Sequence, residues 1–265
     1  MSVAEAWNDK GYNLVNEGKL EEAIKCYDNA LESDPFFFVA WTNKGLALAS
    51  MERDEEAIEC FNRALEINST DAFTILNKAN SLLALQNYEA AIECYDKSLE
   101  LTKDSVMNCM AYYNKGCILA SLKWFRKAIE CYNAILELDQ SIAVVWVNKG
   151  SAHSNLEEEE EAIRCYKKAL DLDPGLALAW RDLGYSYSML NNFQEAIKCY
   201  NKALQIDPYY YDAMMNKAFA LNETEQFEEA IKLYDVILNA NPGFEDAIYS
   251  KQVAVRNLET RDRKK

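Results

Sequence analysis

Apolar residues recur three and four positions apart along most of this chain, in short segments separated by polar stretches. This period is typical of amphipathic helices. Only four Pro and eight Gly occur, too few for the turns of a many-stranded sandwich. Ala, Leu, Glu and Lys, which all favour helix, are abundant. The pattern therefore predicts an all-α fold.

The helical pattern itself repeats with a fixed period. Seven times, a large apolar residue is followed three and four positions later by Lys or Leu and then by Gly or Ala. These large residues are Trp7, Trp41, Ile75, Tyr112, Trp146, Trp180 and Met214. Their spacing is 34 residues, except for one interval of 37 between the third and the fourth. A second column, Ala followed four residues later by Tyr or Phe, accompanies each, from Ala23 and Tyr27 to Ala230 and Tyr234. Such a period is typical of helical repeat proteins.

The glycine and proline columns have physical reasons. Gly within a helix costs about 1 kcal/mol relative to Ala, so its retention predicts close approach of the paired helix that carries the Ala column. All four prolines fall in one column, at Pro35, Pro174, Pro208 and Pro242. Because proline cannot continue a helix, this column ends the second helix of a unit. Each unit is therefore expected to be a helical hairpin that buries its aromatic residues only against its neighbours.

These columns closely resemble the signature of the tetratricopeptide repeat, W-x-x-L-G-x-x-Y … A-x-x-x-F-x-x-A … P, over residues 4–244. The chief departure is Lys in place of the Leu beside the Gly in most units, for example Lys44 and Lys115. The resemblance implies seven repeats starting at residues 4, 38, 72, 109, 143, 177 and 211. It also implies a right-handed α-solenoid superhelix in which the first helix of each repeat lines a concave groove.

The expected organisation is a single solenoid over residues 1–265. Beyond residue 244 the pattern continues for half a unit, with Ile248 and Val255 in the columns of Trp7 and Leu14. It predicts a capping helix over 245–258 that covers the last apolar face, followed by a charged tail over 259–265. The three extra residues lie around Thr102–Asn108, and they are expected to extend a helix or a loop.

Charge and hydropathy limit the class of partner. The net charge of −15 and the pI near 4.6 argue against nucleic acid, which needs a basic surface. No apolar run approaches the roughly 20 residues of a membrane helix, and the first residues lack the layout of a secretory signal. The chain is therefore expected to be cytoplasmic, without a membrane or nucleic-acid partner.

The residues that could carry catalysis do not form a site. Six of the eight cysteines share one column, at Cys26, Cys60, Cys94, Cys131, Cys165 and Cys199. Cysteines 34 residues apart on stacked helices form neither a disulfide nor a metal pair, and a packing role is expected. His153 is the only histidine and is expected to be a core or half-buried residue, while the acidic run Glu157–Glu161 is expected to be a solvated turn. The sequence therefore predicts no enzyme, no metal and no cofactor.

The first helices of units two to five present an uncharged face when residues are placed at the period of 3.6. Its candidate contact residues are Val39, Leu46, Phe73, Leu76, Asn80, Met110, Tyr113, Val144 and Val147. In a chain with 27% charged residues, a long face without charge indicates a contact surface. The alternative is that some of these residues are half-buried between neighbouring units.

A column of asparagines follows the same face, once in most units, with Asp9 and Asp182 in the same column. Its members are Asn43, Asn77, Asn114, Asn148 and Asn216. A side-chain amide has a donor and an acceptor, so a row of amides can hydrogen-bond the backbone of an extended peptide. Such a row looks like those lining the superhelix of O-linked N-acetylglucosamine transferase. The alternative is that each Asn bonds the neighbouring helix.

These features predict a non-catalytic scaffold that binds an uncharged, partly apolar peptide or helix. Tetratricopeptide domains that hold chaperone C-termini resemble one another in a Lys and Arg clamp for two carboxylates. At the corresponding places this chain has Asn8, Tyr12, Asn43, Phe73 and Asn77, which disfavours that ligand. The alternative function is self-association through the groove or an end face, which would make the chain a homo-oligomer.

Overall fold

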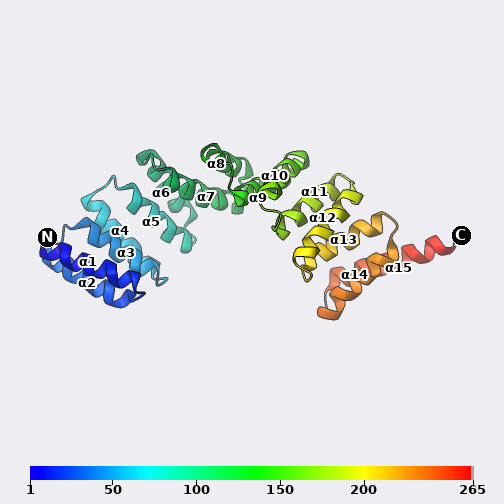
Figure 1. Cartoon of the computed structure of the whole chain (residues 1–265), viewed down its shortest axis with the longest axis horizontal. Coiled ribbons are helices and arrows are strands. Elements are labelled where there is room, and N and C mark those ends of the chain that lie inside the picture. Colours follow the sequence, from blue (N-terminus) through cyan, green and yellow to red (C-terminus); the bar gives the residue numbers. More distant parts are fainter. Residues whose placement is uncertain (264–265) are drawn as a thin grey trace. The chain divides into compact units, whose positions relative to one another are not determined.

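The computed structural model describes residues 1–263, and these form fifteen α-helices and no strand (Figure 1). The predicted all-α fold is confirmed. The helices are α1 (Val3–Asn16), α2 (Leu20–Ser33), α3 (Phe38–Ala49), α4 (Asp54–Ile67), α5 (Ala72–Ala84), α6 (Tyr88–Leu101), α7 (Ser105–Ser121), α8 (Phe125–Leu138), α9 (Ala143–Ser154), α10 (Glu159–Leu172), α11 (Ala177–Met189), α12 (Phe193–Ile206), α13 (Tyr211–Glu223), α14 (Phe227–Ala240) and α15 (Glu245–Arg263).

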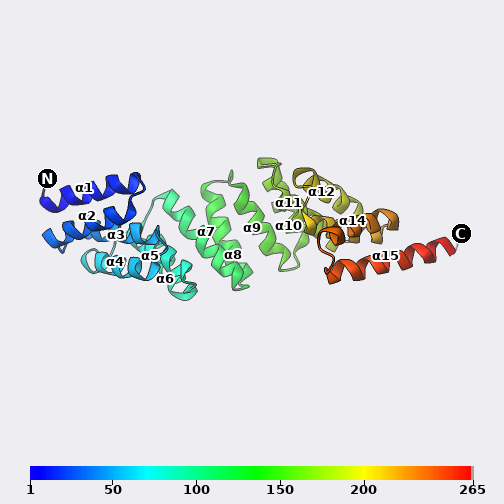
Figure 2. The same ribbon diagram turned by 90° about the horizontal axis from the view of Figure 1, so that it is seen from below.

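The chain divides into two compact units, Met1–Trp124 with α1 to α7 and Phe125–Lys265 with α8 to α15. Within each unit, consecutive helices pack on each other, and each odd-numbered helix also contacts the next odd-numbered one (Figure 2). The odd-numbered helices α1 to α13 are the predicted first helices, and the even-numbered ones are the second helices. A single solenoid over residues 1–265 stays a prediction.

The glycine column marks the closest approach within a hairpin, as predicted. A Cβ added to Gly11 would lie 2.6 Å from the Tyr27 ring, and one on Gly184 would lie 2.6 Å from the Tyr200 ring. The aromatic side chains of this column are fully buried, and so is the Ala column beside them. The second helix therefore places its ring directly on the backbone of the first helix.

The lysines that replace the Leu beside the Gly join neighbouring hairpins. Lys44 Nζ lies 2.6 Å from Asp28 Oδ1, on the second helix of the preceding hairpin. Lys251 lies 2.5 Å from Asp235 in the same relation, and Lys115 pairs with Asp96. The departure from the family signature is thus an ion pair across each of these junctions.

The C-terminal helix is longer than predicted. α15 continues to Arg263, beyond the expected end at residue 258, so most of the predicted tail is helical. Arg261 holds this last part on α14, since it pairs with Glu228 and its guanidinium lies 5.5 Å from the centre of the Phe227 ring. The predicted tail residues 264–265 lie outside the described residues.

The insertion near Thr102–Asn108 lengthens a first helix. α7 has 17 residues, whereas the other first helices have 12 to 14. Asp104 is its N-cap and accepts a 2.9 Å hydrogen bond from the backbone N–H of Met107. A capping carboxylate satisfies an amide that the helix itself leaves unpaired, so the extra turn begins at Ser105.

The acidic run at 157–161 is only partly solvated, which corrects the prediction. Glu159 begins α10 and is 6% exposed, with its Oε1 3.1 Å from Ser154 Oγ. His153 is buried, as expected, and its Nδ1 lies 2.8 Å from Glu158 Oε2. Glu158 also pairs with Arg126, and these bonds hold the pKa of the Glu158 carboxyl below its usual range. The bonds of Glu158 and Glu159 therefore link α8, α9 and α10 within the second unit.

Candidate functional site

In the second to sixth repeats, the second residue of the pattern is apolar and partly exposed on a first helix. In the first unit these residues are Phe73 and Met110, each 47% exposed. In the second unit they are Val144 and Leu178, 46% and 47% exposed. Val39 occupies the same position on α3 and is less exposed. We call the surface made by the second, sixth and ninth repeat positions the first-helix face.

In the first unit, the first-helix face forms an apolar strip across three neighbouring helices. Val39, Phe73 and Met110 occupy one position on α3, α5 and α7, and α5 contacts both of the other helices. Val106 lies one turn before Met110 on α7 and is 68% exposed. The extra turn of α7 thus lengthens the strip. Sequence reasoning missed Val106, although its spacing of four residues from Met110 is the signal that predicts a shared face.

In the second unit, the ninth position adds two aromatic side chains that sequence reasoning also missed. Tyr185 is 43% exposed and Phe219 is 52% exposed. Phe219 meets Phe193 edge to face with ring centroids 6.2 Å apart, which fixes the Phe219 ring. The repeat period alone predicts both residues, because they occupy the column of Leu46 and Asn80.

Two predicted contact residues are not available for contact. Leu76 is 2% exposed and Val147 is 5% exposed. Leu76 packs in a core cluster with Ala111 and Ile118, and Val147 packs in one with Ala179 and Leu183. The fifth repeat position therefore points at the next first helix, and the structure corrects the assignment of these two residues.

The asparagine column bonds to the protein itself in the first unit. Asn43 Nδ2 donates to Asn8 Oδ1 over 2.9 Å, and Asn114 Nδ2 donates to Asn80 Oδ1 over 3.0 Å. These bonds join neighbouring first helices, which supports the second of the two sequence interpretations. Asn77 Nδ2 instead donates to the Phe73 carbonyl in its own helix, over 2.8 Å.

These bonds use one of the two amide protons of each donor, and every amide oxygen has two lone pairs. The side chains of the column stay half-buried rather than buried, in both units, including Asn148 and Asn216. Leu46 and Tyr113 are half-buried as well. The column therefore presents oriented amides beside the exposed apolar residues.

A charged pair interrupts the first-helix face of the second unit. Arg181 Nη1 lies 2.9 Å from Asp182 Oδ1, and Arg181 Nε donates to the Tyr210 hydroxyl over 3.0 Å. Burial raises the pKa of Asp182 to about 6, and the neighbouring guanidinium opposes this shift. The second unit thus has a charged residue, Arg181, at the fifth position, where the first helices of the first unit hold only uncharged residues.

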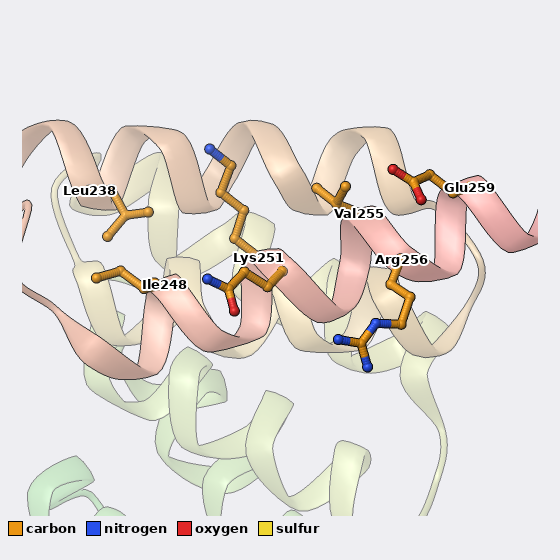
Figure 3. Close-up of a pocket in the computed structure, with 7 residues that line it drawn as sticks. Leu238, Ile248, Lys251, Val255, Arg256 and Glu259 are labelled. Carbon is orange, nitrogen blue, oxygen red and sulfur yellow. The ribbon is translucent and has the colours of Figure 1, made fainter.

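A pocket of about 450 Å³ lies where α14 and α15 end the second unit (Figure 3). Leu238 and Ile248 point toward one another on one side, while Lys251, Arg256 and Glu259 surround it. Gln252 also lines this pocket and stands in the column that holds Gly184. Because that column needs a small residue beneath the ring of a second helix, Gln252 disfavours another hairpin of the same kind at this face.

The described residues hold no group of three or more His, Cys, Asp or Glu side chains placed to bind a metal. The cysteine column lies mostly buried, and burial raises the pKa of Cys165 to about 11 and that of Cys199 to about 12. The Cys165 and Cys199 thiols are therefore protonated at neutral pH and weak nucleophiles. No helix within residues 1–263 is long and apolar enough to cross a membrane.

Comparison with known families agrees with the column geometry. A model of the tetratricopeptide repeat matches residues 4–37, 38–71, 143–176 and 177–210, and a second model of this repeat matches residues 71–141. Together these matches cover more than half of the chain. The chain is a tetratricopeptide repeat protein. Its family supplies scaffolds for protein interactions.

Solved tetratricopeptide structures share the fold at low sequence identity. The C-terminal part of a repeat protein from Cytophaga hutchinsonii is 15% identical with a TM-score of 0.78, and the match covers 91% of this chain and 98% of that one. YrrB, a TPR protein with an unusual peptide-binding site, is 23% identical with a TM-score of 0.64, covering 71% and 95%. MamA from Desulfovibrio magneticus RS-1 is 22% identical with a TM-score of 0.61, covering 65% and 96%. No curated protein matched the sequence.

Proposed function

We propose that this tetratricopeptide repeat protein is a non-catalytic, cytoplasmic scaffold whose first-helix face binds an uncharged, partly apolar peptide or helix. The observation that carries the proposal is the half-exposed apolar column represented by Phe73 and Met110. A contiguous apolar strip of this kind gains free energy when a partner covers it, at about 25 cal/mol per Å².

The strip in the first unit has the chemistry to select an uncharged ligand. The second, sixth and ninth positions of α3, α5 and α7 hold no charged residue. A charged ligand side chain would lose its hydration there without gaining a partner. The amides of Asn43, Asn77 and Asn114 can hydrogen-bond the ligand backbone with the donors and lone pairs that their own bonds leave.

The known relatives agree with this proposal without specifying the ligand. YrrB has a peptide-binding site. That relative is below 25% identity and shows the fold, so the identity of the bound segment comes from the surface chemistry of this chain. The non-catalytic role is proposed because burial raises the pKa of Cys165 and Cys199, which makes them weak nucleophiles, and because His153 Nδ1 bonds to Glu158 Oε2.

A displayed library of random 12-residue peptides, selected against the whole protein, tests the proposal. Selected peptides should be rich in apolar residues and poor in Asp, Glu, Lys and Arg. The double variant Phe73→Ala/Met110→Ala should weaken their binding at least tenfold, because each truncation removes about 1 kcal/mol of apolar contact. Leu101→Ala is the matched control, since Leu101 is 41% exposed on a second helix.

Two results would contradict the proposal. One is the absence of any selected peptide with an apolar consensus. The other is equal binding by Phe73→Ala/Met110→Ala and the Leu101→Ala control. The amide contribution is tested separately with Asn77→Ala/Asn114→Ala/Asn148→Ala, which should reduce binding of the same peptides.

Self-association is the second candidate, and the pocket at the end of α14 and α15 favours it. Leu238 and Ile248 give this pocket an apolar side that a second copy could cover. Multi-angle light scattering across a concentration series separates the candidates, because a strict monomer at high concentration removes self-association. A dimer that Ile248→Glu dissociates would support it.

A further inference from the structure

A groove of about 510 Å³ lies on the second helices α10 and α12, away from the first-helix face. Its floor is formed by Trp180, Leu183 and Tyr187 of α11, together with the buried Leu170 and Cys199. Three lysines border it, Lys167 on α10 and Lys198 and Lys202 on α12. None of these residues belongs to the proposed peptide-binding face.

The groove is open because the column that holds Lys44 at the first junction holds Leu183 at this one. At the first junction, Lys44 of α3 crosses to Asp28 on the preceding second helix. At the junction of α10 and α11 the same two columns hold Leu183 and Lys167. Leu183 is too short to cross, and two lysines here would repel each other. Lys167 instead lies 5.6 Å from the centre of the Tyr187 ring, which leaves the groove without a bridging ion pair.

The charge of the border is basic although the chain carries −15 overall. Asp171 and Glu195 face the three lysines, and Glu195 Oε1 lies 2.6 Å from Lys198 Nζ. Lys202 forms no ion pair with any described residue, and Lys167 rests on a neutral ring. Lys202 is therefore available to an anionic partner. Lys198 is available as well, because the side chains of its pair with Glu195 are 70% and 41% exposed and water screens the pair.

The matching positions of the first junction are more acidic. Asp28 stands in the place of Lys167 and Glu59 in the place of Lys198, while Arg63 matches Lys202. The acidic Asp171 and Glu195 are matched by Glu32 and Glu56. Arg63 is also paired with Glu66, 2.9 Å away. An anionic segment is therefore repelled at this junction but attracted to the α10–α12 groove, by the ordinary rules of charge complementarity.

We propose that the α10–α12 groove binds an acidic peptide segment that places one aliphatic or aromatic side chain on the floor of Trp180, Leu183 and Tyr187. Its carboxylates pair with Lys198 and Lys202 at the border, where the lysine stems also cover the inserted side chain. The chain then has two separate binding surfaces of different chemistry, an uncharged one on first helices and a basic one on second helices.

The test uses the whole protein and a fluorescein-labelled probe peptide, Asp-Glu-Asp-Leu-Phe-Asp-Glu-Asp, in an anisotropy titration at low salt. The wild-type protein should bind the probe saturably, and binding should weaken as salt screens the lysines. Lys198→Glu/Lys202→Glu should weaken binding at least tenfold. The control is Arg63→Glu/Lys97→Glu, which makes the same change of net charge at the matching column of α4 and α6 and should have little effect.

Two further variants show whether the probe occupies this groove. Leu183→Lys/Lys167→Asp restores the two columns that Lys44 and Asp28 hold at the first junction. An ion pair should then cross the floor and abolish probe binding, while the helical circular dichroism signal is retained. Phe73→Ala/Met110→Ala should leave probe binding unchanged, so failure of the first-helix proposal does not affect this result.

Several outcomes would overturn the proposal. They are no saturable binding by the wild-type protein, equal loss in the Arg63→Glu/Lys97→Glu control, and unchanged binding by Leu183→Lys/Lys167→Asp. A wild-type dimer that Lys198→Glu/Lys202→Glu dissociates would also overturn it, because a second copy would then cover the groove.

Discussion

Lys44 of α3 reaches back to Asp28 of α2, with Nζ and Oδ1 2.6 Å apart, and so joins two consecutive hairpins. The lysine side chain is 21% exposed and the carboxylate side chain 46% exposed. Water therefore screens the pair, and its contribution is small. Its position matters more than its strength, because it recurs at the junctions of Lys115 with Asp96 and of Lys251 with Asp235.

A double-mutant cycle on Lys44→Ala and Asp28→Ala should give a coupling energy of about 0.5 kcal/mol, which falls in high salt. Urea unfolding followed by circular dichroism measures it. The charge-swapped protein Lys44→Asp/Asp28→Lys should recover most of the lost stability. Zero coupling in low salt would show that the pair does not stabilise the junction.

The glycine column predicts a clear packing defect. Gly184→Ala should lower the free energy of unfolding by about 1 to 2 kcal/mol, although Ala is the better helix former. The new methyl group would lie 2.6 Å from the Tyr200 ring, which must move. Urea unfolding measures the change, and Tyr200→Leu in the same chain should remove most of it. A stabilised Gly184→Ala protein would contradict the close approach.

Ala79 takes the place of Gly in the hairpin of α5 and α6 and is fully buried. A hairpin can therefore accommodate Ala in the glycine column if the aromatic ring of its second helix lies slightly further from the first helix. For this reason the expected cost at Gly184 is moderate.

Asp182 makes the second unit sensitive to pH. Its folded pKa of about 6 lies above the ordinary value of 3.8, so the folded state holds the proton more tightly than the unfolded state. The stability linked to this carboxyl is fully present below pH 3.8 and is lost as the pH rises through about 6. Asp182→Asn should therefore stabilise the protein by about 1 to 3 kcal/mol at pH 7.5 and by much less at pH 4.5.

Urea unfolding at both pH values tests this expectation. Asn is the residue that most other first helices hold in this column, so the substitution fits the fold. Equal effects at the two pH values would show that Asp182 keeps an ordinary pKa. Asp212→Asn, on the exposed start of α13, is the control and should change stability little at either pH.

The sequence alone predicted the helical hairpins and the positions at which their two helices approach most closely. The columns of Gly184 and Tyr200 needed only the repeat period and the sizes of the residues. The lysine column was visible as a departure from the family, but its partner Asp28 was not. That partner lies 16 residues earlier in another hairpin, and its identity depends on how neighbouring hairpins are stacked.

The candidate face was harder to predict for the same reason. A helical period places the second, fifth and ninth positions on one side, but it does not say which of them the next first helix covers. Leu76 and Val147 are covered, whereas Phe73 and Leu178 are not. The amide bond from Asn43 to Asn8 likewise depends on a neighbour that single-helix geometry does not include.

Phe73 and Leu76 give the sharpest test of this distinction, because both are large apolar residues on α5, three positions apart. Leu76→Ala should lower the free energy of unfolding by about 2 to 5 kcal/mol, since Leu76 is 2% exposed and its loss leaves a cavity. Phe73→Ala should change stability by about 0.5 kcal/mol or less, since Phe73 is 47% exposed. Urea unfolding measures both. Peptide binding should show the reverse order, with Phe73→Ala the weaker binder at temperatures where both variants stay folded. Equal stability losses would mean that Phe73 is a packing residue, and the first-helix face would then lose its central contact.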